Sequence, residues 1–389
     1  LGDVYKRQGV DITAGLARHY PHGEIAVHAL GYVGRIDEQA LKILDPSNYR
    51  GTTHFGKIGI EKTYEDLLHG KVGHQQVETT AQGRVLRVLK RNPPVSGHNL
   101  YLTLDTRVQQ AAEAAFGDFA GSAIALDPDN GDIIAFVSLP TYDPNPFVNG
   151  IEYKAYQALR ENEREPLFNR ALRGQYPPGS TIKPFVGLAG LELGVTGDHS
   201  KTYCPGYYTL PGNTRKYRDW KRTGHGTVNL NDSISQSCDV YFYDLALSLG
   251  IDNMNSYLRH FGFGRATGVD IVGELSGLLP SREWKRRRHD QPWFPGETII
   301  TGIGQGFFLT TPLQLAVSTA ALANGGRMLK PNIIYAEQAA NTDALLPHLP
   351  RPMENISIGE QQHWDSVIGS MIDVVHGARG TARAIGKNS

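Results

Sequence analysis

The chain has 389 residues, which is enough for two domains or more. Lysine and arginine together number 39, and so do aspartate and glutamate. This balance gives no reason to expect nucleic acid or an acidic membrane surface as the main partner. No apolar run approaches the ~20 residues that a transmembrane helix needs. Because the chain opens on Leu1 rather than on methionine, we expect a fragment that lacks sequence at both ends.

The first part of the chain, residues 1–96, is expected to form a separate domain. Residues 56–73 (GKIGIEKTYEDLLHGKVG) predict a short amphipathic helix between glycines. Residues 82–98 predict a strand followed by a Pro-Pro-Val-Ser-Gly break, so we place the boundary near Ser96. This part offers no nucleophile next to a base, and we interpret it as a pedestal or an interaction module.

Beyond the boundary, the pattern indicates a mixture of helices and antiparallel sheet. Residues 99–106 alternate as a strand, and Asp105 or Thr106 can cap a helix over residues 107–119. Residues 122–138 are two apolar runs around Asp-Pro-Asp-Asn-Gly, a strong hairpin signal. We therefore expect an α+β fold.

The stretch QYPPGSTIKPF, residues 175–185, places a serine three residues before a lysine. Proline fits a helix only within its first turn, so Pro184 predicts a helix that begins close to Ser180. Ser180 and Lys183 then lie on one face, with the Ser180 hydroxyl at the helix N-terminus. A buried lysine that is uncharged can take the proton of a serine and make it a nucleophile. The pattern alone is weak, since an N-capping serine with a surface lysine has the same spacing.

A second candidate group follows at Ser237-Cys238-Asp239, ahead of an amphipathic helix. A second hydroxyl near Ser180 and Lys183 can relay protons to a leaving group, and a carboxylate can orient that relay. The candidate catalytic residues are therefore Ser180, Lys183, Ser237 and Asp239.

Together these patterns resemble the class B penicillin-binding proteins, which are peptidoglycan D,D-transpeptidases with the fold of the serine β-lactamases. The resemblance is carried by PPGSTIKP, by SCDVYFY and by GIGQGFFLTTPLQLA at residues 302–316. Residues 56–73, 216–226 and 281–298 are similar to the penicillin-binding protein 2 subgroup, the elongation-specific, cell-shape enzymes. The resemblance implies an incomplete pedestal of the penicillin-binding protein dimerisation type at 1–96 and a transpeptidase domain at 97–389.

The end of the chain departs from the family. A third motif, Lys-(Ser/Thr)-Gly, is expected on the strand that lines the far side of the cleft, but Lys387-Asn388-Ser389 lacks its glycine. We expect that strand within about a dozen residues after Ser389. The transpeptidase fold is thus expected to be truncated, no substrate-binding residues are assigned, and we expect the parent protein to be active and this chain inactive.

The resemblance also implies a mechanism and partners. Ser180, activated by Lys183, attacks the D-Ala-D-Ala carbonyl of a stem peptide, and the acyl-enzyme passes to an amine on a neighbouring strand. Ser237 shuttles protons to the leaving amine, and β-lactam antibiotics acylate Ser180 by the same attack. The implied partners are a RodA-type polymerase and an MreC-type scaffold protein, at the periplasmic face of the bacterial inner membrane.

A possible zinc site comprises Cys204, Asp219, His225 and Cys238, whose thiol, carboxylate and imidazole groups suit tetrahedral coordination. These four positions resemble the Asp/His/Cys set on which some members of the penicillin-binding protein 2 subgroup carry zinc. Those relatives often have Asp at the position of Cys204. The spacing is irregular, so two alternatives stay open. The cysteines could form a disulfide in an oxidising periplasm, or the four residues could be inert.

Two other functions also stay open: a β-lactamase or β-lactam sensor, which would need a deacylating base, and a non-catalytic scaffold that activates a glycan polymerase. A dinucleotide site is excluded, because GIGQG lacks the third glycine and the downstream acid.

Overall fold

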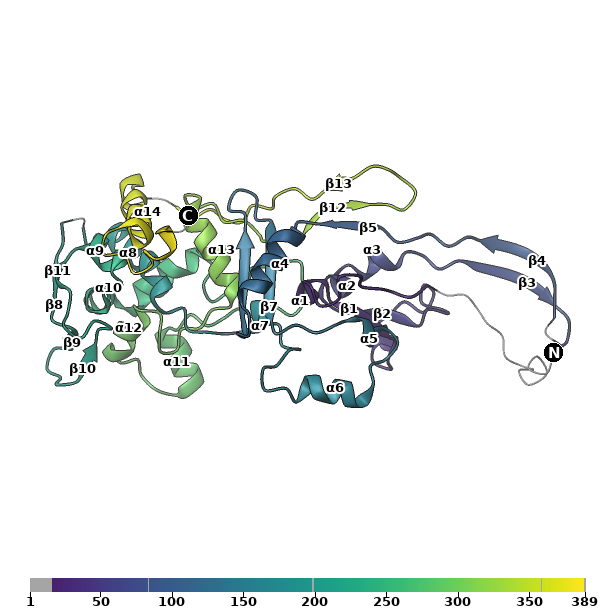
Figure 1. Ribbon diagram of the computed structural model, residues 1–389, viewed down its shortest axis with the longest axis horizontal. Coiled ribbons are helices and arrows are strands. Elements are labelled where there is room, and N and C mark those ends of the chain that lie inside the picture. The colour runs from purple at the N-terminus through teal and green to yellow at the C-terminus, as the bar shows by residue number, and fades with distance from the viewer. Residues whose placement is uncertain (1–15, 83, 198, 358, 388–389) are drawn as a thin grey trace. The chain divides into compact units, whose positions relative to one another are not determined.

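The computed structural model describes residues 16–387 apart from 83, 198 and 358 (Figure 1). Its contacts divide the chain into two compact units, residues 1–97 with 141–167 and residues 98–140 with 168–389. From the sequence we expected residues 97–389 to form one domain, whereas residues 141–167 group with the first unit. The third motif that we expect after Ser389 lies outside the described residues.

The first unit consists of short elements. They are α1 (Val27–Leu30), β1 (Tyr32–Arg35), the 3-10 helix η2 (Ala40–Lys42), β2 (His54–Ile58), α2 (Gly59–Thr63), α3 (Glu65–His69), β3 (His74–Thr79), β4 (Val85–Asn92), α5 (Asn145–Val148) and α6 (Tyr153–Arg160). Strand β1 pairs antiparallel with β2, and β3 pairs antiparallel with β4. The strand predicted after Gln82 is confirmed as β4, whereas the predicted helix is two short helices with Tyr64 between them.

The segment from 141 to 167 groups with the first unit because its aromatic side chains complete a small core there. Tyr142 and Phe147 are buried against Val27, and Tyr32 packs on the same cluster. Asn145 also exchanges two hydrogen bonds with the backbone of Tyr20, at 2.9 and 3.0 Å. Both contacts join residues more than a hundred positions apart, which the local sequence pattern cannot reveal.

The second unit contains sheet elements and a group of helices. Its strands are β5 (Asn99–Leu102), β6 (Gly121–Leu126), β7 (Ile133–Leu139), β8 (Thr202–Cys204), β9 (Tyr207–Thr209), β10 (Lys216–Arg218), β11 (Gly226–Val228), β12 (Ile334–Gln338) and β13 (Leu346–Pro347). Its helices are α4 (Thr106–Ala115), α7 (Arg170–Arg173), η3 (Gly179–Ile182), α8 (Lys183–Glu192), α9 (Leu230–Ser235), α10 (Asp239–His260), α11 (Arg282–His289), α12 (Pro295–Thr301), α13 (Pro312–Ala323), α14 (Gln361–His376) and η4 (Ile385–Lys387).

The predicted hairpin and the helix before it are confirmed. Strands β6 and β7 pair antiparallel, and the Asp105 carboxylate caps α4 by accepting from the N–H groups of Arg107 and Val108. Gln109 fixes α4 on the sheet, because its buried side chain exchanges two hydrogen bonds with the backbone of Phe136. Together with the helices of the second unit, these antiparallel strands confirm the expected α+β class.

Helix α8 lies at the centre of the helical group, in contact with α9, α10 and α14 (Figure 1). It is apolar on every side and its residues from Lys183 to Leu191 are all buried, as its sequence predicts. Phe185 meets the rings of Phe261 and Phe263 edge to face, at 5.0 and 5.2 Å between centroids. The active-site candidates therefore project from a rigid, close-packed support.

Within the described residues, no helix is both long enough and apolar enough to cross a membrane.

We predict that replacing Phe185 with alanine lowers the free energy of unfolding of the second unit by about 3–5 kcal/mol, because the cavity left in a dense core cannot close fully. Phe119→Ala is the control, since that ring is 79% exposed and its loss should cost no more than about 0.5 kcal/mol. Denaturant unfolding of both variants is the measurement. Equal losses of stability in the two variants would show that α8 is not the core of this unit.

Candidate functional site

Ser180 lies in the 3-10 turn η3, immediately before α8 begins at Lys183. Pro184 occupies the first turn of α8, as the sequence predicts. The turn is held from outside by Gly304, whose carbonyl accepts from the N–H of Gly179 at 2.9 Å. A side chain at Gly304 would overlap the backbone of Gly179, and Gly304 itself has φ +70°, so glycine is required there. The GIGQG stretch thus acts as a backbone support for the Ser180 turn.

Lys183 is 1% exposed, and its Nζ makes three polar contacts. It donates to Asp239 Oδ1 at 2.7 Å, to the Ser237 carbonyl at 2.9 Å and to Ser237 Oγ at 3.1 Å. An ammonium group has three donors, so this environment satisfies a protonated Lys183 completely. The buried charge is compensated by the Asp239 carboxylate, whose side chain is 13% exposed.

Ser237 connects Lys183 to Ser180. Its hydroxyl donates to Ser180 Oγ at 2.9 Å while it accepts from Lys183 Nζ. The spacing places Ser180 and Lys183 on one face, and the structure shows that the hydrogen-bond chain between them runs through Ser237. The reason is that Nζ also turns towards Asp239, on the neighbouring helix α10.

The backbone at Ser237 is strained. Its φ is +57°, a left-handed conformation that residues other than glycine rarely adopt and that costs on the order of 1–3 kcal/mol. The strain occurs in the tight turn between α9 and α10, where the N–H of Cys238 donates to the carbonyl of Ser233 at 2.9 Å. The packed helices hold this turn and aim the Ser237 hydroxyl at Ser180.

Asp239 is oriented by the segment around Asp219. Its Oδ2 accepts from the backbone N–H of Trp220 at 3.1 Å, so each carboxylate oxygen has one partner. Asp219 Oδ2 in turn accepts from the N–H groups of Asp239 and Val240 at 2.8 and 3.2 Å. It thereby satisfies two free N–H groups at the N-terminus of α10.

The four candidate catalytic residues are thus brought together. In order, the hydrogen-bonded row consists of two hydroxyl groups from the serines, the buried amine of Lys183 and the carboxylate of Asp239 that orients it. Such a row can move a proton from an attacking hydroxyl to a leaving group, which is the chemistry of acyl transfer.

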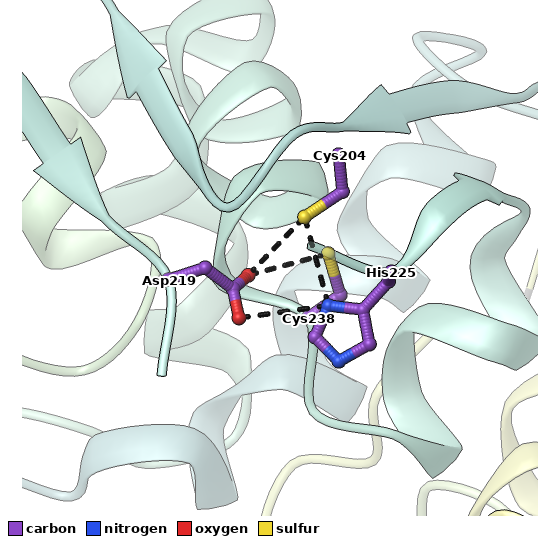
Figure 2. A group of neighbouring side chains, drawn as sticks. All are labelled: Cys204, Asp219, His225 and Cys238. Carbon is purple, nitrogen blue, oxygen red and sulfur yellow. Dashed lines mark hydrogen bonds and ion pairs between the residues drawn. The ribbon is translucent and has the colours of Figure 1, made fainter. Parts of the chain in front are cut away.

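The four candidate metal ligands also meet (Figure 2). They adjoin this row, because Cys238 lies between Ser237 and Asp239 in the chain. Their ligand atoms lie within 4.8 Å of one another, and each side chain is buried or nearly so. Asp219 Oδ2 lies 3.6 Å from Cys204 Sγ and 3.5 Å from Cys238 Sγ. His225 Nδ1 lies 3.6 Å from Cys204 Sγ and 3.5 Å from Asp219 Oδ1.

These distances fit tetrahedral zinc. With Zn–S of about 2.3 Å and Zn–N or Zn–O of about 2.0–2.1 Å, the sulfur-to-oxygen and sulfur-to-nitrogen edges of a tetrahedron are about 3.5–3.6 Å. Burial lowers the pKa of His225, which favours the neutral imidazole that metals bind. Burial raises the pKa of the Cys238 thiol, so the thiolate needs a cation to be stable here. The donor set therefore suits a metal ion.

Trp220 is a site residue that our sequence reasoning missed. Its backbone N–H binds Asp239, and its indole N–H donates to the carbonyl of Gln236 at 3.1 Å. Trp220 follows directly after Asp219, and its indole packs edge-on to the ring of His225. The only signal in the sequence was its position directly after the candidate ligand Asp219. A role of the backbone N–H cannot be recognised from the residue type.

Comparison with known families gives two matches. The model described as penicillin binding protein transpeptidase domain matches residues 121–389, and that described as penicillin-binding protein dimerisation domain matches residues 4–102.

Individual proteins are similar over nearly the whole chain. The peptidoglycan D,D-transpeptidase MrdA of Acinetobacter baumannii is 46% identical over 98% of this chain, which spans 56% of that protein. The structure of Pseudomonas aeruginosa PBP2 in complex with WCK 5153 has a TM-score of 0.86 at 49% identity and covers 96% of this chain and 77% of that one. The complex between PBP2 and MreC from Helicobacter pylori has a TM-score of 0.85 at 35% identity, covering 98% and 68%.

The resemblance to penicillin-binding protein 2 is thereby confirmed, and the chain belongs to the penicillin-binding protein family, with a transpeptidase domain at 121–389 and a dimerisation domain at 4–102.

Proposed function

We propose that the protein carrying this chain is a serine-type peptidoglycan D,D-transpeptidase, with Ser180 as the nucleophile. The observation that carries the proposal is the row from Ser180 Oγ through Ser237 Oγ to Lys183 Nζ, with hydrogen bonds of 2.9 and 3.1 Å. The substrates are peptidoglycan stem peptides that end in D-Ala-D-Ala, and β-lactams acylate the same serine.

In the acylation step, Ser180 Oγ attacks the penultimate D-Ala carbonyl as its proton leaves. This step requires the uncharged form of Lys183, with the hydroxyls rotated so that Ser180 donates to Ser237 and Ser237 donates to Lys183 Nζ. The proton moves along this reversed row, and the acceptors around Lys183 then stabilise the ammonium formed. The backbone N–H of Ser180 supplies one donor to the oxyanion. When the C–N bond breaks, the Ser237 hydroxyl returns a proton to the leaving nitrogen, and D-alanine departs.

In the second step, the amine of another stem peptide attacks the acyl ester. Its proton follows the same row to Ser180 Oγ as the ester bond breaks, which regenerates the serine and completes the cross-link. Asp239 is a positioning residue in both steps, because it orients Lys183 and is itself fixed by the N–H of Trp220. A β-lactam carbonyl would enter at the same place and leave a stable ester.

We further propose that Cys204, Asp219, His225 and Cys238 hold a structural zinc ion. A bound zinc ion would offset two of the three negative charges that the two thiolates and the carboxylate carry in this buried place. The four side chains then tie β8, the 219–225 segment and the turn before α10 together. Because Asp219 also binds the N-terminus of α10, this cluster supports the position of Ser237 and Asp239.

The proposed setting is the periplasmic face of the bacterial inner membrane, with an MreC-type scaffold and a RodA-type polymerase as partners. The support is similarity to the Helicobacter pylori PBP2 that forms a complex with MreC. A dimerisation domain at residues 4–102 suits a role in protein contacts.

We predict that Ser180→Ala abolishes labelling of the full-length protein by fluorescent penicillin, because no ester can form without Oγ. Binding to an MreC-type scaffold should be unchanged and serves as the control for folding. Persistent labelling at the level of the unaltered protein would refute Ser180 as the nucleophile.

We predict that Ser237→Ala slows penicillin acylation by about 10²–10⁴-fold, because it removes the link between Ser180 and Lys183. Ser235→Ala is the matched control. That hydroxyl lies two positions away and donates to the carbonyl of Asp232, outside the row. Stopped-flow or gel-based acylation rates give the comparison, and an unchanged rate for Ser237→Ala would contradict a proton path through Ser237.

We predict about one zinc ion per chain in protein purified without chelator, measured by elemental analysis. Cys238→Ser and His225→Ala should reduce the zinc content severalfold, because three remaining ligands bind far more weakly. His199→Ala, an exposed histidine outside the cluster, is the control. A zinc content well below one in the unaltered protein would contradict the proposed site.

A further inference from the structure

The cluster beside the active site contains both cysteines of the chain. Both are buried, since Cys204 is 1% exposed and Cys238 is 0% exposed. Both sulfur atoms contact the same oxygen, Asp219 Oδ2. The two Sγ atoms are no more than 4.8 Å apart. Two thiols this close can be oxidised to a disulfide, whether or not the cluster binds a metal.

A disulfide requires the sulfurs to approach to about 2.0 Å. From the present separation this is a movement of at most about 3 Å, shared between the two cysteines. The reaction begins when local opening of the metal-free cluster lets one sulfur attack a disulfide oxidant and form a mixed disulfide. The second sulfur, no more than 4.8 Å away, then displaces the outer thiol and closes the intramolecular bond. The two cysteines come from different segments, β8 and the turn before α10, so the bond would cross-link them.

We propose that Cys204 and Cys238 form a redox-sensitive dithiol that closes to an intramolecular disulfide whenever no metal ion holds the sulfurs. The oxidant is a disulfide of the oxidising compartment. It accepts the electron pair and both thiol protons to become two thiols, while one S–S bond forms in the cluster. The protecting effect of the metal rests on the zinc site proposed above, but the formation of the disulfide does not.

The position of Cys238 gives this oxidation a consequence. Cys238 lies between Ser237 and Asp239, in the turn that already holds Ser237 at φ +57°. Drawing Cys238 Sγ towards Cys204 pulls on the turn that carries Ser237 and on the start of α10, whose N–H groups Asp219 binds. We expect this shift to move the Ser237 hydroxyl out of its position between Ser180 and Lys183, so that the disulfide slows acylation.

The test uses the full-length protein in zinc-loaded and chelator-treated forms, each exposed to oxidised glutathione or to the azodicarboxamide oxidant diamide. Diamide takes up the two hydrogens that the thiols lose. Peptide mapping under non-reducing conditions scores the Cys204–Cys238 bond, and alkylation after denaturation scores the free thiols.

We expect the chelated protein to form the bond at least about tenfold faster than the zinc-loaded protein, since metal coordination holds the sulfurs apart. The oxidised form should acylate with penicillin at least about tenfold more slowly and should recover after reduction with a phosphine. Cys204→Asp keeps an oxygen ligand but removes one thiol, so its acylation should not respond to the oxidant. Cys204→Ser serves the same purpose if the aspartate variant fails to fold.

Two free thiols at Cys204 and Cys238 after oxidation of the chelated protein would overturn the proposal. An oxidised protein that still acylates at full rate would overturn the coupling to the active site. The zinc content and the reduced protein's labelling are scored separately, so a failure of the metal site or of the transpeptidase assignment is distinguishable from a failure of the disulfide.

Discussion

The structure of the site depends on the hydrogen-bond partners of one buried amine, that of Lys183. Lys183 Nζ has three acceptors, two of them on Ser237 and one on Asp239, and all three come from the start of α10 and the turn before it. The hydroxyl of Ser180 enters this set only through Ser237. The surroundings of the Ser180 hydroxyl, before the start of α8, are therefore set by the N-terminus of another helix, α10. Any change that moves the start of α10 changes the environment of the Lys183 amine and the reach of the Ser237 hydroxyl together.

The start of α10 is in turn held by Asp219, which links the two groups of functional residues. Its Oδ2 accepts from two N–H groups of α10 and lies against both sulfurs of the cluster. The following residue, Trp220, binds the Asp239 carboxylate. The cysteine and histidine cluster and the row of candidate catalytic residues are thus parts of one hydrogen-bonded network. Within such a network the effects of single substitutions are not additive, because each residue supports several others.

Much of the site follows from local sequence rules. Pro184 can lie only in the first turn of a helix, and this fixes where α8 begins and places Lys183 near Ser180. The apolar character of α8 on all sides predicts its burial correctly. The cap of α4 at Asp105 and the β6–β7 hairpin also follow from residue types alone. In each case, a strong local preference agrees with the final structure.

The remainder depends on contacts between distant residues, which no local rule encodes. Ser237 adopts a left-handed conformation without glycine, against its intrinsic preference, because packed helices on both sides enforce it. Because Tyr142 and Phe147 pack in the core of the first unit, residues 141–167 belong to that unit, although the segments before and after them, 98–140 and 168–389, belong to the second. Trp220 acts through its backbone N–H, and Gly304 through the absence of a side chain.

The most direct test of this account is to locate the ester formed with penicillin in the full-length protein, by tandem mass spectrometry of its peptides. The account predicts the penicilloyl group on Ser180, with Ser237 unmodified. An ester on Ser237, or on a serine outside this row, would contradict the account, because the proton path then would not begin at Ser180.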